Sequence, residues 1–427
     1  MNPAILIATT TRWFPTVRLG IAFANAGCAV DAVCPSGHPL ARTKALRRMY
    51  RYSNFAPLSS LADAISASQP DLIVPGDDLA THRLHELYER EFVRNGKQSQ
   101  ICLLLERSLG RPESFPIVYE RARFMQLAHE AGVRVPKTRA ITGLGELRGW
   151  TAETGFPVVL KSDGSSGGEG VKVVHTVDDA ERAFRKLHAP PLLARAAKRA
   201  LVDGDTTLLW PSLLRRRPVI SGQTFIAGRE ANSTVACWKG SVLAALHFEV
   251  LNKTHATGHA TVLKLVEHSE MARAVETMVA RLKLSGVHGF DFVLEASTRD
   301  AYLIEINPRS TQVGHLALGP GRDLAFALVS AAVGTNIQPS QTLIDNQTIA
   351  LFPQEWARDP ASSFLQSAYH DVPWEEPELI RACVDRVRKR NRSLKKSDWD
   401  QAVAHLMRFA PKKSAAAPSS QVRPETE

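Results

Sequence analysis

The sequence has few cysteines, no long apolar run and no dinucleotide-binding fingerprint. Its 427 residues include five cysteines, an odd number, scattered without the paired spacing of metal sites. Reduced thiols in a cytoplasmic protein are therefore the simplest interpretation. No stretch approaches the roughly 18 apolar residues that a membrane-spanning helix needs. The first segment, MNPAILIATT, lacks a basic region before its apolar residues, so we expect a strand there and not a signal peptide.

The net charge of +10 is localised, which argues against a surface that binds nucleic acid. Eleven Lys or Arg and three Asp lie between Arg381 and Lys413, so this segment carries most of the excess positive charge. A localised basic tail is more often a solvated segment than a reader of bases. Beyond about residue 412 the chain is rich in Ala, Ser and Pro, and we expect it to be disordered.

The first 95 residues alternate predicted strands and helices, a pattern that indicates a small parallel sheet. The apolar runs that predict its strands lie at residues 4–8, 29–33 and 71–75. No G-x-G-x-x-G follows the first run, so a dinucleotide site is not supported. Ligands of such sheets bind beyond the carboxyl ends of the strands, which makes residues 9–12 and 76–78 the candidate substrate edge. For Asp77 a helix cap is an equal alternative.

Two acids and an amide in the segment 289–309 are spaced to share one face of a hairpin. Glu305 and Asn307 lie two residues apart late in the second predicted strand, and antiparallel pairing can bring Asp291 of the first strand beside them. Oxygen donors that converge in this way favour a cation between them. Mg²⁺, which is held by few carboxylates together with substrate phosphates, suits such a set. The alternative is a surface hairpin whose acids are solvated.

A lysine and a glycine-rich loop precede this hairpin. The apolar run 156–161 ends in Lys161, and a buried lysine is rare without an anionic partner. Glycines in the following loop allow backbone amides to face a phosphate without obstruction by side chains. No Gly-Lys-Ser or Gly-Lys-Thr follows, so the loop is not a P-loop, and taken alone it is equally compatible with a hairpin turn. The candidate phosphate-binding residues of the loop are Ser165, Ser166, Gly167 and Gly168.

Taken together, these segments resemble the ATP-grasp superfamily, in its carbamoyl-phosphate-synthase and biotin-carboxylase-like branch. FPVVLK at 156–161, SSGGEG at 165–170 and EINPR at 305–309 occur in the order and spacing of that family, and the resemblance covers roughly residues 1–335. It implies an α/β fold, α+β in the ATP-grasp part, in which a small parallel-sheet domain precedes a two-subdomain ATP-grasp fold. It also implies ATP and Mg²⁺ (or Mn²⁺) as cofactors.

The resemblance assigns further roles by position. A family lysine that reaches the nucleotide phosphates corresponds to Arg121, and an acid that holds the ribose corresponds to Glu230. An exposed helix arginine and an ordinary strand acid are the alternatives for these two residues. The hinge of the grasp, whose backbone holds adenine, carries glutamine and threonine in place of the usual acid, which leaves the backbone contacts intact. Its residues are Gln223, Thr224, Phe225 and Ile226.

The implied reaction is ADP-forming ligation, in which a carboxylate is activated as an acyl phosphate and attacked by an amine or another nucleophile. Lys161, Arg121 and the loop amides would neutralise the phosphates, and Arg309 would stabilise charge on the transferred groups. Lys161 and Arg309 are therefore the candidate catalytic residues. Two alternatives remain at this point: an ATP-grasp kinase acting on a small-molecule acceptor, and a non-catalytic ATP-binding module. The complete set of charged residues argues against the second.

We expect five parts in the chain. They are a Rossmann-like domain at 1–95, a linker with one short helix at 96–118, an ATP-grasp domain at 119–335 with a lid subdomain at about 135–222, an extension at 336–411, and a disordered tail at 412–427. The run 349–353 is predicted as the final strand. The loop 252–259, with two histidines, is predicted to lie on the substrate side and not to bind zinc. Expected partners are a small-molecule carboxylate, an amine co-substrate and, in a homodimer, a second copy of the chain, with no specific nucleic acid and no membrane.

Overall fold

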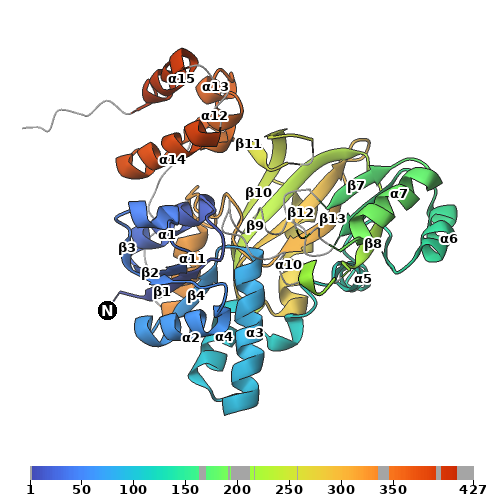
Figure 1. Ribbon diagram of the computed structural model, residues 1–427, viewed down its shortest axis with the longest axis horizontal. Coiled ribbons are helices and arrows are strands. Elements are labelled where there is room, and N and C mark those ends of the chain that lie inside the picture. The colour runs from blue at the N-terminus through green and yellow to red at the C-terminus, as the bar shows by residue number, and fades with distance from the viewer. Residues whose placement is uncertain are drawn as a thin grey trace, which may run out of the picture.

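The computed structural model describes residues 2–162, 170–190, 193, 212–215, 217–256, 258–334, 346–390 and 396–410. Three sheets organise these residues, and Figure 1 shows them side by side with helices packed on their faces. The predicted phosphate-binding residues Ser165, Ser166, Gly167 and Gly168 lie outside the described residues, as do most of the insertion at 188–218 and the tail beyond residue 410.

The first sheet is parallel and has the strand order β3-β2-β1-β4. Its strands are β1 (Ala4–Ala8), β2 (Ala29–Cys34), β3 (Leu46–Arg51) and β4 (Leu72–Pro75). The three predicted strands are present, but β3 was missed by the sequence pattern. Its sequence, LRRMYR, is mostly exposed because β3 is the edge strand, so it lacks the apolar run that marks a buried strand.

Helices cover both faces of this sheet. The helices are α1 (Pro15–Asn25), α2 (Pro57–Ser68), α3 (Asp78–Asn95) and α4 (Gln100–Leu109). The last three pack on one face, and α1 packs on the other (Figure 1). Helix α4 lies in the predicted linker, yet its Cys102 and Leu105 are fully buried in the core beneath β4. The boundary at residue 95 stays a prediction.

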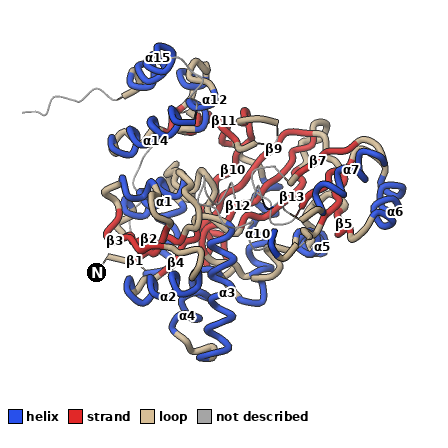
Figure 2. The backbone as a smooth tube through the Cα atoms, in the orientation of Figure 1, coloured by secondary structure: helices blue, strands red, loops and turns tan. Residues whose placement is uncertain are grey.

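The central sheet has seven strands in the order β13-β12-β9-β10-β11-β14-β15. Figure 2 shows β9, β10, β11, β12 and β13 running side by side. Its strands are β9 (Gly228–Trp238), β10 (Ser241–Lys253), β11 (Ala260–Leu265), β12 (Gly286–Glu295), β13 (Ala301–Asn307), β14 (Thr348–Leu351) and β15 (Tyr369–Asp371). Helices α5 (Arg121–Glu130) and α10 (Ser269–Leu282) cover one face of β9, β12 and β13. Helix α11 (Leu324–Val333) packs between the opposite face and α1, so the first two sheets share one core.

The run 349–353 contains a strand, as predicted, but this strand is not the final one. Strand β14 is followed by β15, which pairs with it in parallel, and then by two long helices. The three residues of β15 are too few to produce a periodic sequence signal. The helices of this last part are α12 (Gln354–Arg358), α13 (Phe364–Ser367), α14 (Pro377–Arg390) and α15 (Lys396–Met407), which surround the buried Trp356.

The third sheet is antiparallel and has the order β5-β8-β6-β7. Its strands are β5 (Thr138–Ile141), β6 (Val158–Ser162), β7 (Val171–Val174) and β8 (Ile220–Thr224). Helices α6 (Leu144–Thr154) and α7 (Val177–His188) cover one of its faces. Gly222 of β8 lies directly under α6, where a Cβ atom would come within 2.7 Å of the Trp150 ring. The neighbours of Gly222 on β8 therefore face away from these helices.

Among the described residues, none of the helices combines the length and apolar character needed to cross a lipid bilayer. All five cysteines are free and buried. Burial raises the pKa of the Cys34 and Cys383 thiols to about 12, so neither provides a thiolate nucleophile at neutral pH.

Candidate nucleotide and metal site

The hairpin formed by β12 and β13 brings the two predicted acids together. Asp291 is directly opposite Glu305, and Asn307 Nδ2 donates a hydrogen bond to Asp291 Oδ2 at 3.0 Å. The pairing slips at this point, because Phe292 is opposite Leu303 and Ile304 is an extra residue. Leu303 is fully buried in the apolar core, so strict alternation would also direct Glu305 into that core. The bulge turns Glu305 towards Asp291.

A glycine makes room for this arrangement. Gly289 is opposite Asn307, and a Cβ atom at Gly289 would lie 2.3 Å from Thr311 Cγ2 and 3.3 Å from Asn307 Cβ. A larger residue would therefore displace the backbone that follows the EINPR segment.

Strand β9 adds a polar residue that the sequence pattern did not reveal. Asn232 is directly opposite Asp291 on the other side of β12, so it faces the same side of the sheet. Its Oδ1 atom is buried and has no hydrogen-bond partner among the described residues. The sequence does hold one indication of this residue: Asn232 lies two residues after Glu230, and residues two apart on a strand share a face. A buried acceptor without a donor indicates a place for a cation or a ligand donor.

These donors fit a magnesium ion. The set consists of the carboxylates of Asp291 and Glu305 and the amides of Asn307 and Asn232, which are the hard oxygen ligands that Mg²⁺ takes. Burial, and then the neighbouring charge of Glu305, raises the pKa of Asp291 to about 6, a shift that a bound cation would reverse. No group of three or more His, Cys, Asp and Glu that could hold a metal occurs in the described part of the chain, so the amides are needed to complete this set.

Two basic residues face this cluster. Lys161, near the end of β6, is 5% exposed, and burial lowers its pKa to about 8, opposed by the charge of Glu305. Arg121, at the start of α5, contacts Glu305 with 3.0 Å between Nη2 and Oε1. Part of the negative charge of Glu305 is thus balanced by the chain itself, whereas the sequence suggested that only a metal would balance it. A highly charged phosphate can compete for both basic groups.

Arg309 is held by the first domain. Its Nε atom lies 3.0 Å from Asp78 Oδ1, at the start of α3, and its Nη2 lies 3.3 Å from Asn307 Oδ1. The guanidinium also lies over the Trp13 ring, 5.2 Å from the centroid. Thr81 Oγ1 donates to Pro308 O at 2.7 Å. Neither Trp13 nor this ion pair could be read from the sequence, because the partners lie more than 200 residues apart.

Asp77 has a structural role, and Asp78 is the neighbour that reaches the site. Asp77 Oδ1 accepts a hydrogen bond from Ala80 N at 2.8 Å, which is the predicted helix cap. Its Oδ2 accepts from Thr9 Oγ1 and Thr10 N, both at 2.6 Å. Asp77 therefore fixes the loop after β1, at the carboxyl edge that was predicted to contact substrate.

The hinge residues connect the third sheet to the central sheet. Gln223 is 2% exposed, Phe225 is 40% exposed, and Thr224 and Ile226 are intermediate. Glu230 is half-exposed and forms an ion pair with Lys253, with 2.7 Å between Oε1 and Nζ. Burial, and then the nearby charge of Arg309, lowers the pKa of His259, so this histidine lies near the same site. The roles assigned to these residues stay predictions.

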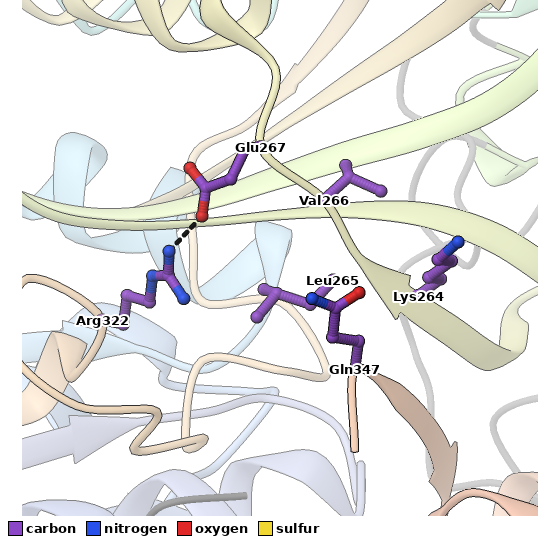
Figure 3. Close-up of a pocket in the computed structure, with 6 residues that line it drawn as sticks. All are labelled: Lys264, Leu265, Val266, Glu267, Arg322 and Gln347. Carbon is purple, nitrogen blue, oxygen red and sulfur yellow. Dashed lines mark hydrogen bonds and ion pairs between the residues drawn. The ribbon is translucent and has the colours of Figure 1, made fainter. Parts of the chain in front are cut away.

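A surface pocket lies on another part of the central sheet (Figure 3). Its lining residues are Lys264, Leu265, Val266, Glu267, Arg322 and Gln347. Glu267 and Arg322 form an ion pair across it. Strand β11, which contributes two of these residues, is three strands away from β12, so the pocket is separate from the acidic cluster.

Comparison with known proteins relates the chain to enzymes that use ATP. Residues 120–339 match the family described as "Carbamoyl-phosphate synthase L chain, ATP binding domain". The chain is 26% identical over 323 residues to a formate-dependent phosphoribosylglycinamide formyltransferase of Bifidobacterium adolescentis, which covers 72% of this chain and 71% of that protein. It is 22% identical over 236 residues to the carbamoyl phosphate synthase large chain of Mesorhizobium japonicum, covering 53% of this chain but 20% of that protein.

Solved structures share the fold at low identity. A biotin carboxylase from Campylobacter jejuni, in complex with β-γ-ATP, has a TM-score of 0.57 at 16% identity and covers 80% of this chain and 73% of its own. An N5-carboxyaminoimidazole synthetase from Staphylococcus aureus, complexed with ADP, has a TM-score of 0.55 at 14% identity, with 80% and 81% covered. The family match spans half of the chain, and the predicted resemblance, fold class and reaction class are confirmed. The chain therefore belongs to the carbamoyl-phosphate synthase L chain ATP-binding domain family, and with it to the ATP-grasp carboxylate ligases.

Proposed function

We propose that the cluster around Asp291 and Glu305 binds ATP with magnesium and activates a small-molecule carboxylate for attack by an amine. The observation that supports this most is the convergence of Lys161 and Arg121 on the paired acids of the β12–β13 hairpin. Basic groups and carboxylates at one point match a phosphate group and its metal ion. The formate-dependent relative is named for a one-carbon carboxylate, which supports a carboxylate as the activated group here.

Two displacements complete the proposed reaction. A carboxylate oxygen attacks the γ-phosphorus, the bond to the β,γ-bridging oxygen breaks, and ADP leaves with that electron pair. The amine nitrogen then attacks the acyl carbon, inorganic phosphate leaves with the acyl oxygen, and the nitrogen loses a proton. No protein nucleophile is required, so catalysis consists of positioning and charge stabilisation.

The chain provides a charged partner for each end of the transferred group. Lys161 and Arg121 are placed to neutralise phosphate oxygens beside Glu305. Arg309 lies where the first domain meets the central sheet, and its charge would stabilise the acyl phosphate as it forms. Asp291, Glu305 and the amides would hold Mg²⁺, which would supply charge neutralisation for the nucleotide phosphates.

The acceptor is proposed to bind between Arg309 and the loop after β1. That loop is fixed by Asp77, and Trp13 at its end contacts Arg309.

The test is a screen of carboxylic and amino acids, singly and in pairs, for ADP release with product masses. We expect ADP and phosphate only when both an acid and an amine are present, and a product mass equal to their sum less one water. A product heavier than a single acceptor by one phosphoryl group would instead identify a kinase. No ADP release with any pair, in a protein that binds ATP, would contradict ligation.

A further inference from the structure

A buried carboxylate near the end of the chain joins two segments that are far from it in the sequence. Asp371, at the end of β15, is 1% exposed. Its Oδ1 atom lies 2.5 Å from Arg18 Nη2 on α1, and its Oδ2 atom lies 2.7 Å from His315 Nε2. These partners are 353 and 56 residues away in the chain. Asp371 therefore contacts the first domain and the segment after the EINPR motif at the same time.

The protonation states make this contact a hydrogen bond with a defined direction. Burial acts to raise the pKa of Asp371, but the charge of Arg18 and the contact with His315 outweigh burial, so its pKa lies below the usual value. Burial lowers the pKa of His315, opposed by the charge of Asp371. At neutral pH an uncharged imidazole therefore donates from Nε2 to an ionised carboxylate. Separating a buried carboxylate from its partners is costly, so these contacts fix the geometry.

The segment 310–315 follows Arg309 directly and lies outside the helices and strands. Its middle residue, Gln312, donates from Nε2 to Ala260 O at 3.0 Å. Gln312 Oε1 accepts from Gln354 Nε2 at 3.4 Å. Gln354 begins α12 and so belongs, like β15, to the part of the chain after residue 346. This C-terminal part thus holds the segment at two points.

The same contacts tie both ends of the segment to the first domain. Arg309, at the near end, is held by Asp78, and the far end reaches Arg18 through Asp371. Figure 1 shows α12 next to β11 and α14 next to the first domain. The C-terminal part lies beyond the family match, which ends at residue 339, so these contacts are not a feature of the matched domain.

We propose that Asp371 is a positioning residue for the ligation and acts on Arg309 through His315. Holding both ends of the segment against the first domain keeps Arg309 where its charge would stabilise the acyl phosphate. A displacement of about 1 Å at such a group can cost about 10²-fold in rate. The C-terminal part of the chain then contributes to catalysis without touching the substrate. This inference rests on the proposed function, because Arg309 acts there on the transferred group.

The test compares two substitutions of His315. Leucine removes the donor to Asp371 and leaves the ion pair with Arg18 intact, whereas glutamine keeps an amide donor at a similar reach. His315→Leu should lower the turnover of acceptor-dependent ADP formation by about tenfold and change the KM for ATP by less than about threefold. His315→Gln should recover most of the rate. His129→Leu, exposed on α5, is the matched control and should change neither quantity.

Hydrogen exchange of the backbone amides in residues 309–316, measured by mass spectrometry, reports the position of the segment without any substrate. Exchange there should be about tenfold faster in His315→Leu, with β12 and β13 unchanged. Thr311 keeps its hydrogen bond to Thr234 in this variant, so the segment loosens while the fold is retained. His315→Asn, which is polar but too short to reach Asp371, replaces the leucine variant if that protein does not fold.

Normal turnover in a folded His315→Leu protein would overturn the inference, and so would unchanged exchange in the segment. A rate in His315→Gln as low as in His315→Leu would also overturn it, because the bond to Asp371 would then not be the cause. A loss of ATP affinity equal to the loss of turnover would place the effect at the nucleotide and contradict positioning of Arg309. Absence of ADP formation by the intact protein with every acid and amine would instead remove the proposed function, and this inference with it.

Discussion

The polar groups that the central sheet and the third sheet contribute to the proposed nucleotide site differ in whether they already have partners within the protein. On the central sheet the charged groups are already paired: Glu305 with Arg121, Asp291 with Asn307, and Arg309 with Asp78. On the third sheet Ser221 Oγ and Gln223 Nε2 are buried without hydrogen-bond partners in the described part of the chain, as is the uncharged Asn232 Oδ1 on the central sheet. The paired side holds its geometry before any ligand binds, whereas the unpaired side gains hydrogen bonds only from a ligand.

We therefore expect substitutions on the two sheets to affect different quantities, the turnover rate and the affinity for the ligand. Pre-paired charges on a rigid sheet cost little reorganisation during a reaction, so changes there should act mainly on turnover. Unpaired groups on the third sheet would stabilise the bound ground state and the transition state equally. Substitutions there should therefore act mainly on binding.

Glu305→Gln should reduce acceptor-dependent ADP formation by about 10²–10³-fold or more. The amide keeps the size of the side chain but removes a charge that the proposed metal requires. Steady-state turnover and a thermal melt are measured together. Glu276→Gln, exposed on α10, is the control and should retain activity. Normal turnover in Glu305→Gln would remove the metal assignment.

Arg309→Ala should lower turnover by roughly 10²-fold while ATP and Mg²⁺ still bind, because its charge is needed mainly at the transferred group. Calorimetry and turnover, both measured on this variant, separate the effect on ATP binding from the effect on catalysis. Arg273→Ala, exposed on α10, is the matched control. A loss of ATP affinity equal to the loss of turnover would place Arg309 at the nucleotide instead.

Asp78→Asn tests the ion pair with Arg309 from its partner in the first domain. It removes the charge that orients Arg309 and keeps the shape, so turnover should fall several-fold while the KM for ATP stays constant. Asp63→Asn, exposed on α2, should have no effect. Restoration of turnover by Asp78→Glu would confirm positioning, and a shift only in melting temperature would indicate a purely structural contact.

Lys161→Ala should weaken ATP binding by about 10- to 150-fold, which corresponds to about 1.5–3 kcal/mol for a hydrogen bond to a charged group. Titration calorimetry measures the change. Lys172→Ala on the neighbouring β7 is exposed and serves as the control. Unchanged affinity in a folded Lys161 variant would contradict the phosphate assignment.

Metal-dependent nucleotide binding should weaken by about tenfold between pH 7 and pH 5. The pKa of Asp291 is raised to about 6, so its carboxylate is ionised above that value and takes up a proton as the pH falls through it. A metal needs the ionised form, so binding releases a proton. The same shift stabilises the protein without ligand at low pH, and that contribution is lost as the pH rises through about 6. Asp291→Asn should remove the pH dependence, and a flat profile in the intact protein would exclude Asp291 as a ligand.

Part of this site follows from local pattern. The apolar run ending in Lys161 and the spacing of Glu305 and Asn307 predict strands and faces by period alone, and both strands are present. The sequence predicted that antiparallel pairing could bring Asp291 beside Glu305 and Asn307, and Asp291 is directly opposite Glu305. Such features depend mainly on residues close together in the chain, so a local sequence pattern is enough to predict them.

Other features of the site depend on contacts between residues that are far apart in the chain. The bulge at Ile304 determines which side of the sheet Glu305 faces. The bulge is needed because Leu303 packs in the apolar core. The partner of Arg309 comes from a helix of the first domain, and Asn232 reaches the cluster through a neighbouring strand. Contacts between residues far apart in the chain leave no periodic trace, because their energy depends on how the sheets and helices pack.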